Sequence, residues 1–138
     1  MKHTDRELDA AFTLLKLGEG STPYVPWLQI QHSPDVRKRQ SQKVRDSHPD
    51  RIPVILESHP SAATEFRQVM ILTIPNITLS MFILRVRDNL KLDRNVRIIV
   101  SVPTNQTHLI NFDMTMGELY KRVGDSDGFL YILYLPVV

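Results

Sequence analysis

Cysteine is absent from the 138 residues. Because thiolate chemistry needs that residue, its absence excludes a cysteine protease, a thioester-forming transferase, a disulfide framework and a Cys-based zinc site. Glycine is scarce, with 5 residues, and no glycine-rich phosphate loop occurs. The 5 histidines have no metal-ligand spacing, and no Ser-His-acid set is present. We therefore predict a protein that is not an enzyme, with no catalytic residue, no metal and no cofactor.

A strong excess of one charge and long apolar runs are also lacking. Lys and Arg total 17 against 15 acidic residues, and a net charge of +2 is too small to predict a nucleic-acid partner. The apolar stretches fall short of the roughly 18 residues that span a bilayer. The first residues are polar and lack the apolar core of a secretory signal. We therefore expect a cytoplasmic location.

The length predicts one domain and a tail, because a chain of this size buries about 68% of its unfolded surface in a single core. Residues 1–32 are predicted to be an N-terminal extension, and residues 33–138 the domain. Residues 24–30 are apolar and interrupted by proline, which predicts an extended segment. Residues 4–17 are predicted to form a short amphipathic helix. Its apolar positions are Leu8, Ala11, Phe12 and Leu15.

The domain is predicted to begin with a basic helix and a hairpin. Ser-Pro-Asp at residues 33–35 supplies an N-cap, a first-turn proline and an acid, and the helix is expected to run to about Ser47. The β-branched runs at residues 51–57 and 68–74 predict two hairpin strands. Pro53 predicts that one side of the first strand is exposed or lies at an edge.

The remaining sequence predicts a crossover helix, two strands and a short helix. Thr78 is the predicted cap of a helix with one apolar stripe, and a strand follows over residues 96–102. Residues 115–118 form a capping box. Asp-Ser-Asp-Gly at residues 125–128 predicts a turn, because a calcium loop needs further ligands and a distal Glu. Residues 129–135 are expected to be a strand buried on both faces. The stripe consists of Leu79, Phe82, Ile83, Val86 and Leu90.

This order of elements predicts an α+β fold, in which one helix crosses a four-stranded mixed sheet. A right-handed crossover places the third strand at the far edge and leaves the last strand a central slot. The arrangement is the ubiquitin-like β-grasp, here with extra N-terminal helices.

Several linked signatures resemble one family. They are His-Pro-Asp-Arg-Ile-Pro-Val-Ile-Leu-Glu at residues 48–57, Ile-Pro at residues 74–75 before the Thr-capped helix, Met-Gly-Glu-Leu-Tyr at residues 116–120 and Asp-Gly-Phe-Leu-Tyr at residues 127–131. Together they are similar to the ubiquitin-like autophagy modifiers of the microtubule-associated protein light-chain-3 and GABARAP group. The resemblance covers roughly residues 33–134 in the same order and spacing.

The resemblance implies a modifier that is conjugated through a C-terminal glycine to phosphatidylethanolamine. Its implied partners are receptor and adaptor proteins, whose aromatic-x-x-aliphatic peptides add a strand to the edge of the sheet and fill two apolar pockets. If a C-terminal glycine exists, the conjugation-cascade enzymes and a processing protease are further partners. Once lipidated, the protein would lie on the autophagosome membrane.

Carried over residue by residue, the resemblance implies a peptide site with two pockets, an edge strand that includes Ile71, and flanking cations. Arg51 matches a position that contacts acidic residues beside the peptide, and Arg87 matches a basic position on the crossover helix. The first pocket, which accepts the aromatic side chain, maps onto Val44, Pro53, Ile55, Thr73 and Phe129. The second pocket maps onto Leu72, Ile74, Pro75, Ile77 and Phe82.

The chain departs from the family pattern at several positions. Val-Met-Ile at residues 69–71 stands where the family usually has lysines, so we expect a weaker preference for acidic peptide flanks. Arg85 and Arg97 stand where the family is apolar. The sequence as written stops a few residues before the family's glycine, so we do not expect lipid conjugation of this C-terminus.

Two alternatives stay open. Trp27 and Ile30 have the aromatic-x-x-aliphatic spacing of the family's own ligand, which makes them a candidate intramolecular ligand. The other interpretation is that both side chains pack the extension on the flank of the domain. The alternative function is a non-conjugated ubiquitin-like scaffold or cytoskeleton-associated binding protein that acts through the basic helix.

Overall fold

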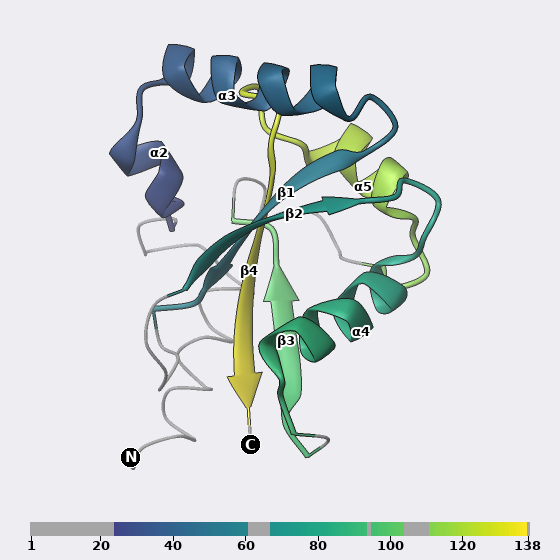
Figure 1. The fold of residues 1–138 in the computed structure, drawn as a ribbon. Coiled ribbons are helices and arrows are strands. Elements are labelled where there is room, and N and C mark those ends of the chain that lie inside the picture. The colour runs from purple at the N-terminus through teal and green to yellow at the C-terminus, as the bar shows by residue number, and fades with distance from the viewer. Residues whose placement is uncertain (1–23, 61–66, 94, 104–110, 138) are drawn as a thin grey trace.

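The computed structural model describes residues 24–60, 67–93, 95–103 and 111–137, and the helix predicted over residues 4–17 lies outside them. From residue 33 onward, the helices and strands follow one another along the chain in the order that the sequence predicts (Figure 1). The elements are α2 (Trp27–Gln31), α3 (Pro34–Ser47), β1 (Ile52–Ser58), β2 (Gln68–Thr73), α4 (Leu79–Leu90), β3 (Arg97–Ser101), α5 (Met116–Val123) and β4 (Leu130–Val137).

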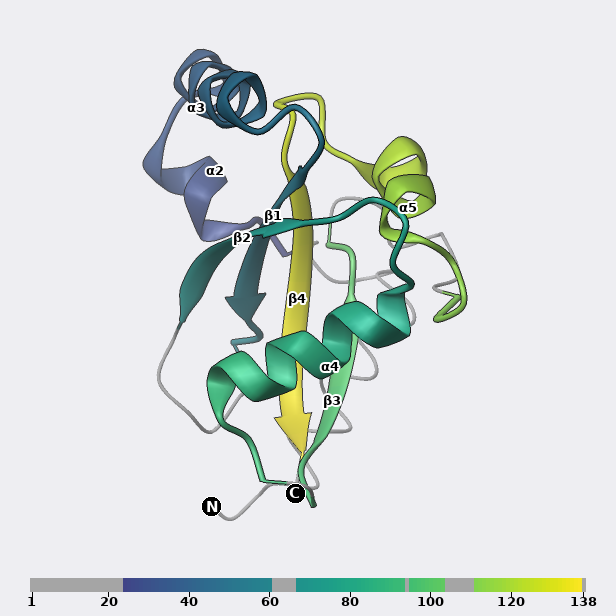
Figure 2. The same cartoon turned by 45° about the vertical axis from the view of Figure 1, so that its right-hand side comes forward.

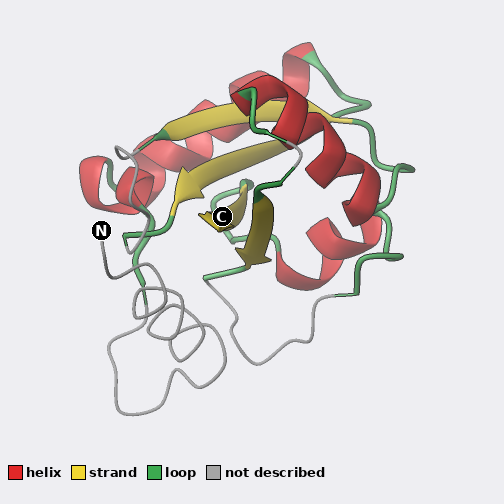
Figure 3. Ribbon diagram, turned by 90° about the horizontal axis from the view of Figure 1, so that it is seen from below, coloured by secondary structure: helices red, strands yellow, loops and turns green. Residues whose placement is uncertain are grey.

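The strands form one four-stranded mixed sheet in the order β2-β1-β4-β3. β1 and β2 pair as an antiparallel hairpin, while β4 runs parallel to β1 and antiparallel to β3. The predicted β-grasp topology is confirmed, because β4 occupies a central slot and β3 the far edge. The described sheet therefore ends in β2 on one side and β3 on the other. Seen from below, the strands form a curved layer with helices around it (Figure 3).

The main core lies between the sheet and α4, which crosses one face of the sheet (Figure 2). Side chains alternate between the two faces along a strand, and one set of β1 and β4 residues meets α4. We call this side the α4 face. The apolar stripe predicted for α4 is confirmed. Its buried members are Leu79, Phe82 and Val86, and Ile83 and Leu90 pack against the same core half-buried.

Helices α3, α4 and α5 begin at the caps that the sequence predicts. The side chains of Ser33 and Thr78 each accept a hydrogen bond from the backbone N–H three residues on, at 3.4 and 3.2 Å. At α5, Thr115 and Glu118 form a reciprocal capping box. Such caps stabilise a helix start by about 1 kcal/mol each, so these boundaries follow from local sequence.

The prediction for Pro53 is wrong, because β1 is an interior strand whose residues are all buried. Pro53 pairs with Leu72 of β2 but precedes Val54, the first β1 residue that pairs with β4. Proline lacks an N–H, and it is tolerated at this position because the ladder to β4 has not yet begun.

The prediction of an extended segment over residues 24–30 is also wrong, because Trp27–Gln31 is helical. Pro26 occupies the N-cap position, ahead of the first turn, where a proline does not disrupt a helix. The backbone N–H groups of Trp27 and Leu28 donate to the carboxylate of Glu57, at 2.9 and 3.3 Å. A carboxylate about 30 positions away thus supplies the cap that the local sequence lacks.

Within the described ranges, no helix is both long and apolar enough to cross a bilayer. In the same part of the chain, no group of three or more His, Asp or Glu side chains is placed to hold a metal ion.

Candidate functional site

The strand register decides which β2 side chains lie on which face of the sheet. Leu72 stands opposite Pro53, and Met70 stands opposite Ile55. Cross-strand partners point to the same face. Ile55 belongs to a cluster on the side of the sheet opposite α4, so Met70 and Leu72 lie on that side as well. We call it the α2 face, because Leu28 of α2 packs against it.

The register places Thr73 and Leu72 on the opposite faces from those predicted, so the assignment of Thr73 to the first pocket and of Leu72 to the second is wrong. Thr73 pairs with Ile52, and Ile71 pairs with Val54, and both partners belong to the core under α4. A shift of one residue exchanges the two faces of a strand. Leu72 thus lies on the same face as Ile55, while Ile71 and Thr73 lie on the α4 face.

Two of the residues predicted for the first pocket, Ile55 and Phe129, belong to one apolar cluster. Ile55, Phe129 and Tyr131 pack together, and Leu28 packs against them. Ile55 is 4% exposed and Phe129 2%, so side chains already cover the floor of the pocket. The rings of Phe129 and Tyr131 meet edge-on, with centroids 6.3 Å apart. Val44 of α3 and Leu72 are half-buried, and Pro53 is buried.

Glu57 fixes α2 on this face. Its side chain is buried, and Oε1 accepts hydrogen bonds from the hydroxyl of Tyr24 at 2.8 Å and from the N–H of Trp27. Oε2 accepts from the N–H of Leu28 and from Nε2 of Gln68, the latter at 2.9 Å. Burial and the neighbouring carboxylate raise the pKa of Tyr24 above its ordinary value. One buried carboxylate therefore joins α2 to the start of β2.

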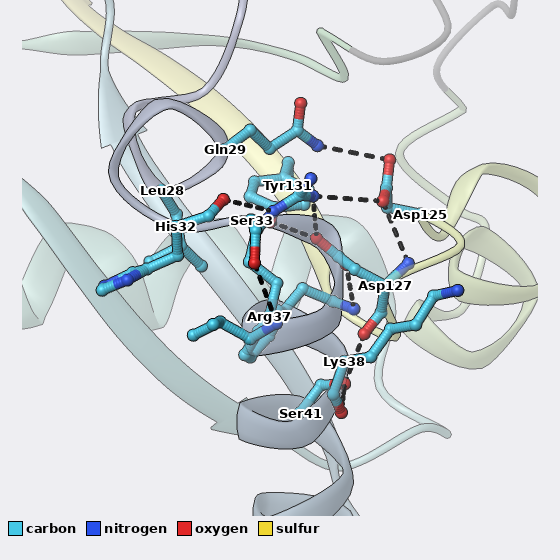
Figure 4. A network of polar contacts seen from close by, with 12 residues as sticks. Leu28, Gln29, His32, Ser33, Arg37, Lys38, Ser41, Asp125, Asp127 and Tyr131 are labelled. Carbon is cyan, nitrogen blue, oxygen red and sulfur yellow. Dashed lines mark hydrogen bonds and ion pairs between the residues drawn. The ribbon is translucent and has the colours of Figure 1, made fainter.

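Asp127 holds α3 against the start of β4 (Figure 4). Its Oδ2 accepts from Nη1 of Arg37 at 2.6 Å and from the hydroxyl of Tyr131 at 2.5 Å, and its Oδ1 accepts from the N–H of Phe129 at 2.9 Å. Burial opposes the charge on Arg37, but hydrogen bonds with Asp127 and Tyr131 outweigh burial and raise its pKa. Burial and Asp127 likewise raise the pKa of Tyr131. The ion pair thus positions Phe129 and Tyr131 in the apolar cluster of the α2 face.

The turn predicted at residues 125–128 is confirmed, and it requires its glycine. Gly128 has a φ of 96°, a conformation that other residues rarely adopt. A Cβ at this position would lie 2.4 Å from Oγ of Ser41, whose hydroxyl donates to the carbonyl of Asp127. The close approach of α3 to the turn therefore depends on glycine at position 128, which has no side chain.

Two of the residues predicted for the second pocket, Pro75 and Ile77, are held by backbone hydrogen bonds from α5. The N–H of Gly117 donates to the carbonyl of Pro75, and the N–H of Met116 donates to the carbonyl of Ile77, both at 2.8 Å. These bonds tie the loop after β2 to the first turn of α5. Phe82 is buried in the main core, while Ile74, Pro75 and Ile77 are half-buried.

Residues 36–136 match the model of the family described as "Autophagy protein Atg8 ubiquitin like". The chain belongs to the Atg8 family. It is 31% identical over 107 residues to Autophagy-related protein 8c of Arabidopsis thaliana, a match that covers 77% of this chain and 87% of that protein. It is 29% identical over 106 residues to an Autophagy-related protein 8-like protein of Dictyostelium discoideum, covering 75% and 84%.

Solved Atg8 structures share the fold. The crystal structure of Trypanosoma brucei ATG8 superimposes with a TM-score of 0.71 at 26% identity, covering 82% of this chain and 96% of that one. Plasmodium falciparum Atg8, in complex with a peptide of P. falciparum Atg3, gives a TM-score of 0.67 at 23% identity, covering 80% and 95%. The protein is therefore an autophagy ubiquitin-like modifier or adaptor with the β-grasp fold of Atg8.

The two cations carried over from the Atg8 family differ in their surroundings. Arg51 is exposed beside Asp50, with 3.8 Å between Nε and Oδ1. The guanidinium of Arg87 instead donates to the carbonyls of Asp93 and Val96. Arg87 thus stabilises the link between α4 and β3, and the structure does not bring it to the edge strand β2.

The candidate intramolecular ligand does not take the form that a strand-adding Atg8 ligand requires. Trp27 and Ile30 lie on helix α2, and they are 44% and 60% exposed. The residue of this segment that reaches the first pocket is Leu28. In this conformation the segment packs on the domain through Leu28, a residue that neither interpretation names.

Sequence reasoning missed Leu28, Glu57, Met70 and Tyr131, which the structure places on this face or at its edge strand. Met70 follows from the strict alternation along β2 once Pro53 is paired with Leu72, so the correct register would have found it. Leu28 and Glu57 had no local signal, because each acts on a partner far away in the sequence.

Proposed function

We propose that this Atg8 family member captures short aromatic-x-x-aliphatic peptides of receptor and adaptor proteins along β2. The observation that carries the proposal is that the described sheet ends at β2, whose Ile71 packs against the main core and whose Met70 lies opposite Ile55 on the other face. An edge strand presents unpaired backbone groups, and an added strand from a peptide satisfies them.

The composition of β2 supports an apolar ligand. Met70 is 45% exposed, and its neighbours on the strand, Val69 and Ile71, are half-buried. Proteins normally blunt such edges with charge, so an uncharged edge favours a binding partner. The strand carries no cation and Arg87 binds carbonyls elsewhere, so of the two cations carried over from the family Arg51 is the exposed one. We therefore propose a weak preference for acidic flanks.

A peptide titration followed by NMR tests the proposal. We expect an aromatic-x-x-aliphatic peptide to shift the backbone amides of β2 and the signals of Ile55 and Phe129. The other edge strand of the described sheet, β3, is the internal control, and its Ile99 amide should not shift. A peptide with both anchors replaced by alanine is the matched control. Shifts confined to β3, or equal shifts with both peptides, would contradict strand addition at β2.

For an encoded protein that carries the family's C-terminal glycine, we further propose the remaining partners and the location from membership of the Atg8 family. These are the conjugation-cascade enzymes, the processing protease, phosphatidylethanolamine and, after lipidation, the autophagosome membrane. Fractionation of cells that express the encoded protein, with and without induction of autophagy, tests this. A membrane-associated, lipid-modified species supports it, whereas an unmodified protein in both conditions contradicts it.

A further inference from the structure

Leu28 covers the first pocket. It packs against the cluster of Ile55, Phe129 and Tyr131 from helix α2. Because Ile55 and Phe129 are 4% and 2% exposed, a ligand side chain reaches them only after a covering side chain has moved. A leucine of the chain itself therefore sits where the aromatic side chain of the proposed ligand would pack.

Helix α2 is suited to being displaced. It has 5 residues, none of them buried. A helix of this length is unstable on its own in water, so its contacts with the domain must hold it. Besides Leu28, these contacts include Nε2 of Gln29, which donates to Oδ1 of Asp125 at 3.3 Å, and the N–H groups that Glu57 accepts.

Glu57 couples α2 to the strand that the peptide would pair with. The same Oε2 accepts from the N–H of Leu28 at 3.3 Å and from Nε2 of Gln68 at 2.9 Å. Gln68 is the first residue of β2. A peptide that adds to β2 therefore lies along a strand whose first residue binds the same Glu57 carboxylate that holds α2.

We propose that Leu28 is a specificity-determining residue of the peptide site and that Glu57 is the positioning residue that holds it in place. A ligand with a large aromatic first anchor must displace Leu28, and that displacement lowers its affinity. A ligand with a small first anchor leaves α2 on the sheet. The inference rests on the proposed function and narrows its ligand class: the wild-type protein has a reduced preference for an aromatic first anchor.

Two peptides that differ only at the first anchor, tyrosine or alanine, test the inference by calorimetry. We expect Leu28→Ala to tighten binding of the tyrosine peptide about tenfold, because a partly buried leucine contact no longer has to be broken. Binding of the alanine peptide should not change. Ile30→Ala is the matched control, since Ile30 is 60% exposed on the same helix, and it should alter neither affinity.

The ratio of the two affinities separates the inference from the proposed function. If both peptides bind but Leu28→Ala leaves their ratio unchanged or lowers it, Leu28 is not the specificity determinant and peptide capture still stands. If neither peptide binds the wild type or the variant, peptide capture itself fails.

Glu57→Gln tests the positioning role without relying on Leu28. We expect it to raise the tyrosine-to-alanine ratio in the same direction and to speed amide exchange at Trp27 and Leu28 in the free protein, because both N–H groups lose the carboxylate. Unchanged exchange at these two amides, with the fold confirmed by unchanged exchange in α4, would overturn the assignment of Glu57.

Discussion

The two faces of the sheet are built on different principles. On the α4 face, apolar side chains such as Val54 and Phe82 pack with 0% and 2% exposure, and helix α4 lies directly across them. On the α2 face, the apolar cluster is small, and buried polar groups, Glu57 and Asp127 among them, fix the helices above it. Helix α4 is held on its face by buried apolar area, whereas the helices on the α2 face are held by a few hydrogen bonds and an ion pair.

This difference separates stability from function. Apolar packing gains free energy roughly in proportion to the area buried and tolerates small shifts. A buried carboxylate acts through a few directed bonds, and leaving it without its donors costs its desolvation penalty, so the position of the helix depends on those bonds. The proposed peptide site spans both faces, with the second pocket on the α4 face and the first pocket, covered by Leu28, on the α2 face.

The largest effect on the free energy of unfolding is expected from removing buried apolar area on the α4 face. Phe82→Ala should lower the free energy of unfolding by about 3–5 kcal/mol, because it deletes a buried ring and leaves a cavity. Leu84→Ala on the same helix is the matched control. Leu84 is 54% exposed, so that change should stay within about 0.5 kcal/mol. Chemical denaturation measures both, and similar losses for the two variants would contradict the assigned core.

A smaller effect is expected from weakening the polar network of the α2 face. Asp127→Asn keeps the shape of the side chain but removes the charge that pairs with Arg37, and we expect a loss of about 2 kcal/mol. Asp46→Asn is the control, because Asp46 is exposed on α3 and accepts from Gln42 at the surface. An Asp127→Asn protein as stable as the wild type would show that area, and not the ion pair, holds this face as well.

The same comparison explains how much the sequence predicts. The α4 face follows from local rules, since the spacing of Leu79, Phe82 and Val86 and the caps at Thr78 and Thr115 lie within a few residues of their partners. The order of the strands follows from the crossover rule. These are the features that the structure confirms.

The α2 face depends on partners distant in sequence, and here the predictions are incomplete. Asp127 binds Arg37 from 90 positions away, and Glu57 caps a helix about 30 positions earlier. The exchange of Leu72 and Thr73 between the pockets has another cause. Successive side chains of a strand point to opposite faces, so an error of one residue in the register exchanges the faces. The pairing of Pro53 with Leu72 is the observation that fixes the register.

The smallest of the three effects is a dependence of stability on pH near neutrality, which the apolar α4 face cannot supply. His59 directly follows β1 and is 4% exposed, and burial lowers the pKa of its imidazole from 6.5. Because the unfolded chain then binds a proton more readily, stability should fall as pH drops below about 6.5. Burial raises the pKa of Asp125, which acts in the opposite direction as the pH falls.

The contribution of His59 is therefore measured as a difference between proteins. Denaturation at pH 7.5 and 5.5 should show a smaller loss for His59→Gln than for the wild type, because the substituted side chain does not titrate. His48→Gln, at an exposed position in the turn before β1, should keep the wild-type loss. If His59→Gln also keeps it, the acid sensitivity arises elsewhere. The polar groups of the α2 face would then be the next place to look, since the apolar side chains of the α4 face do not titrate.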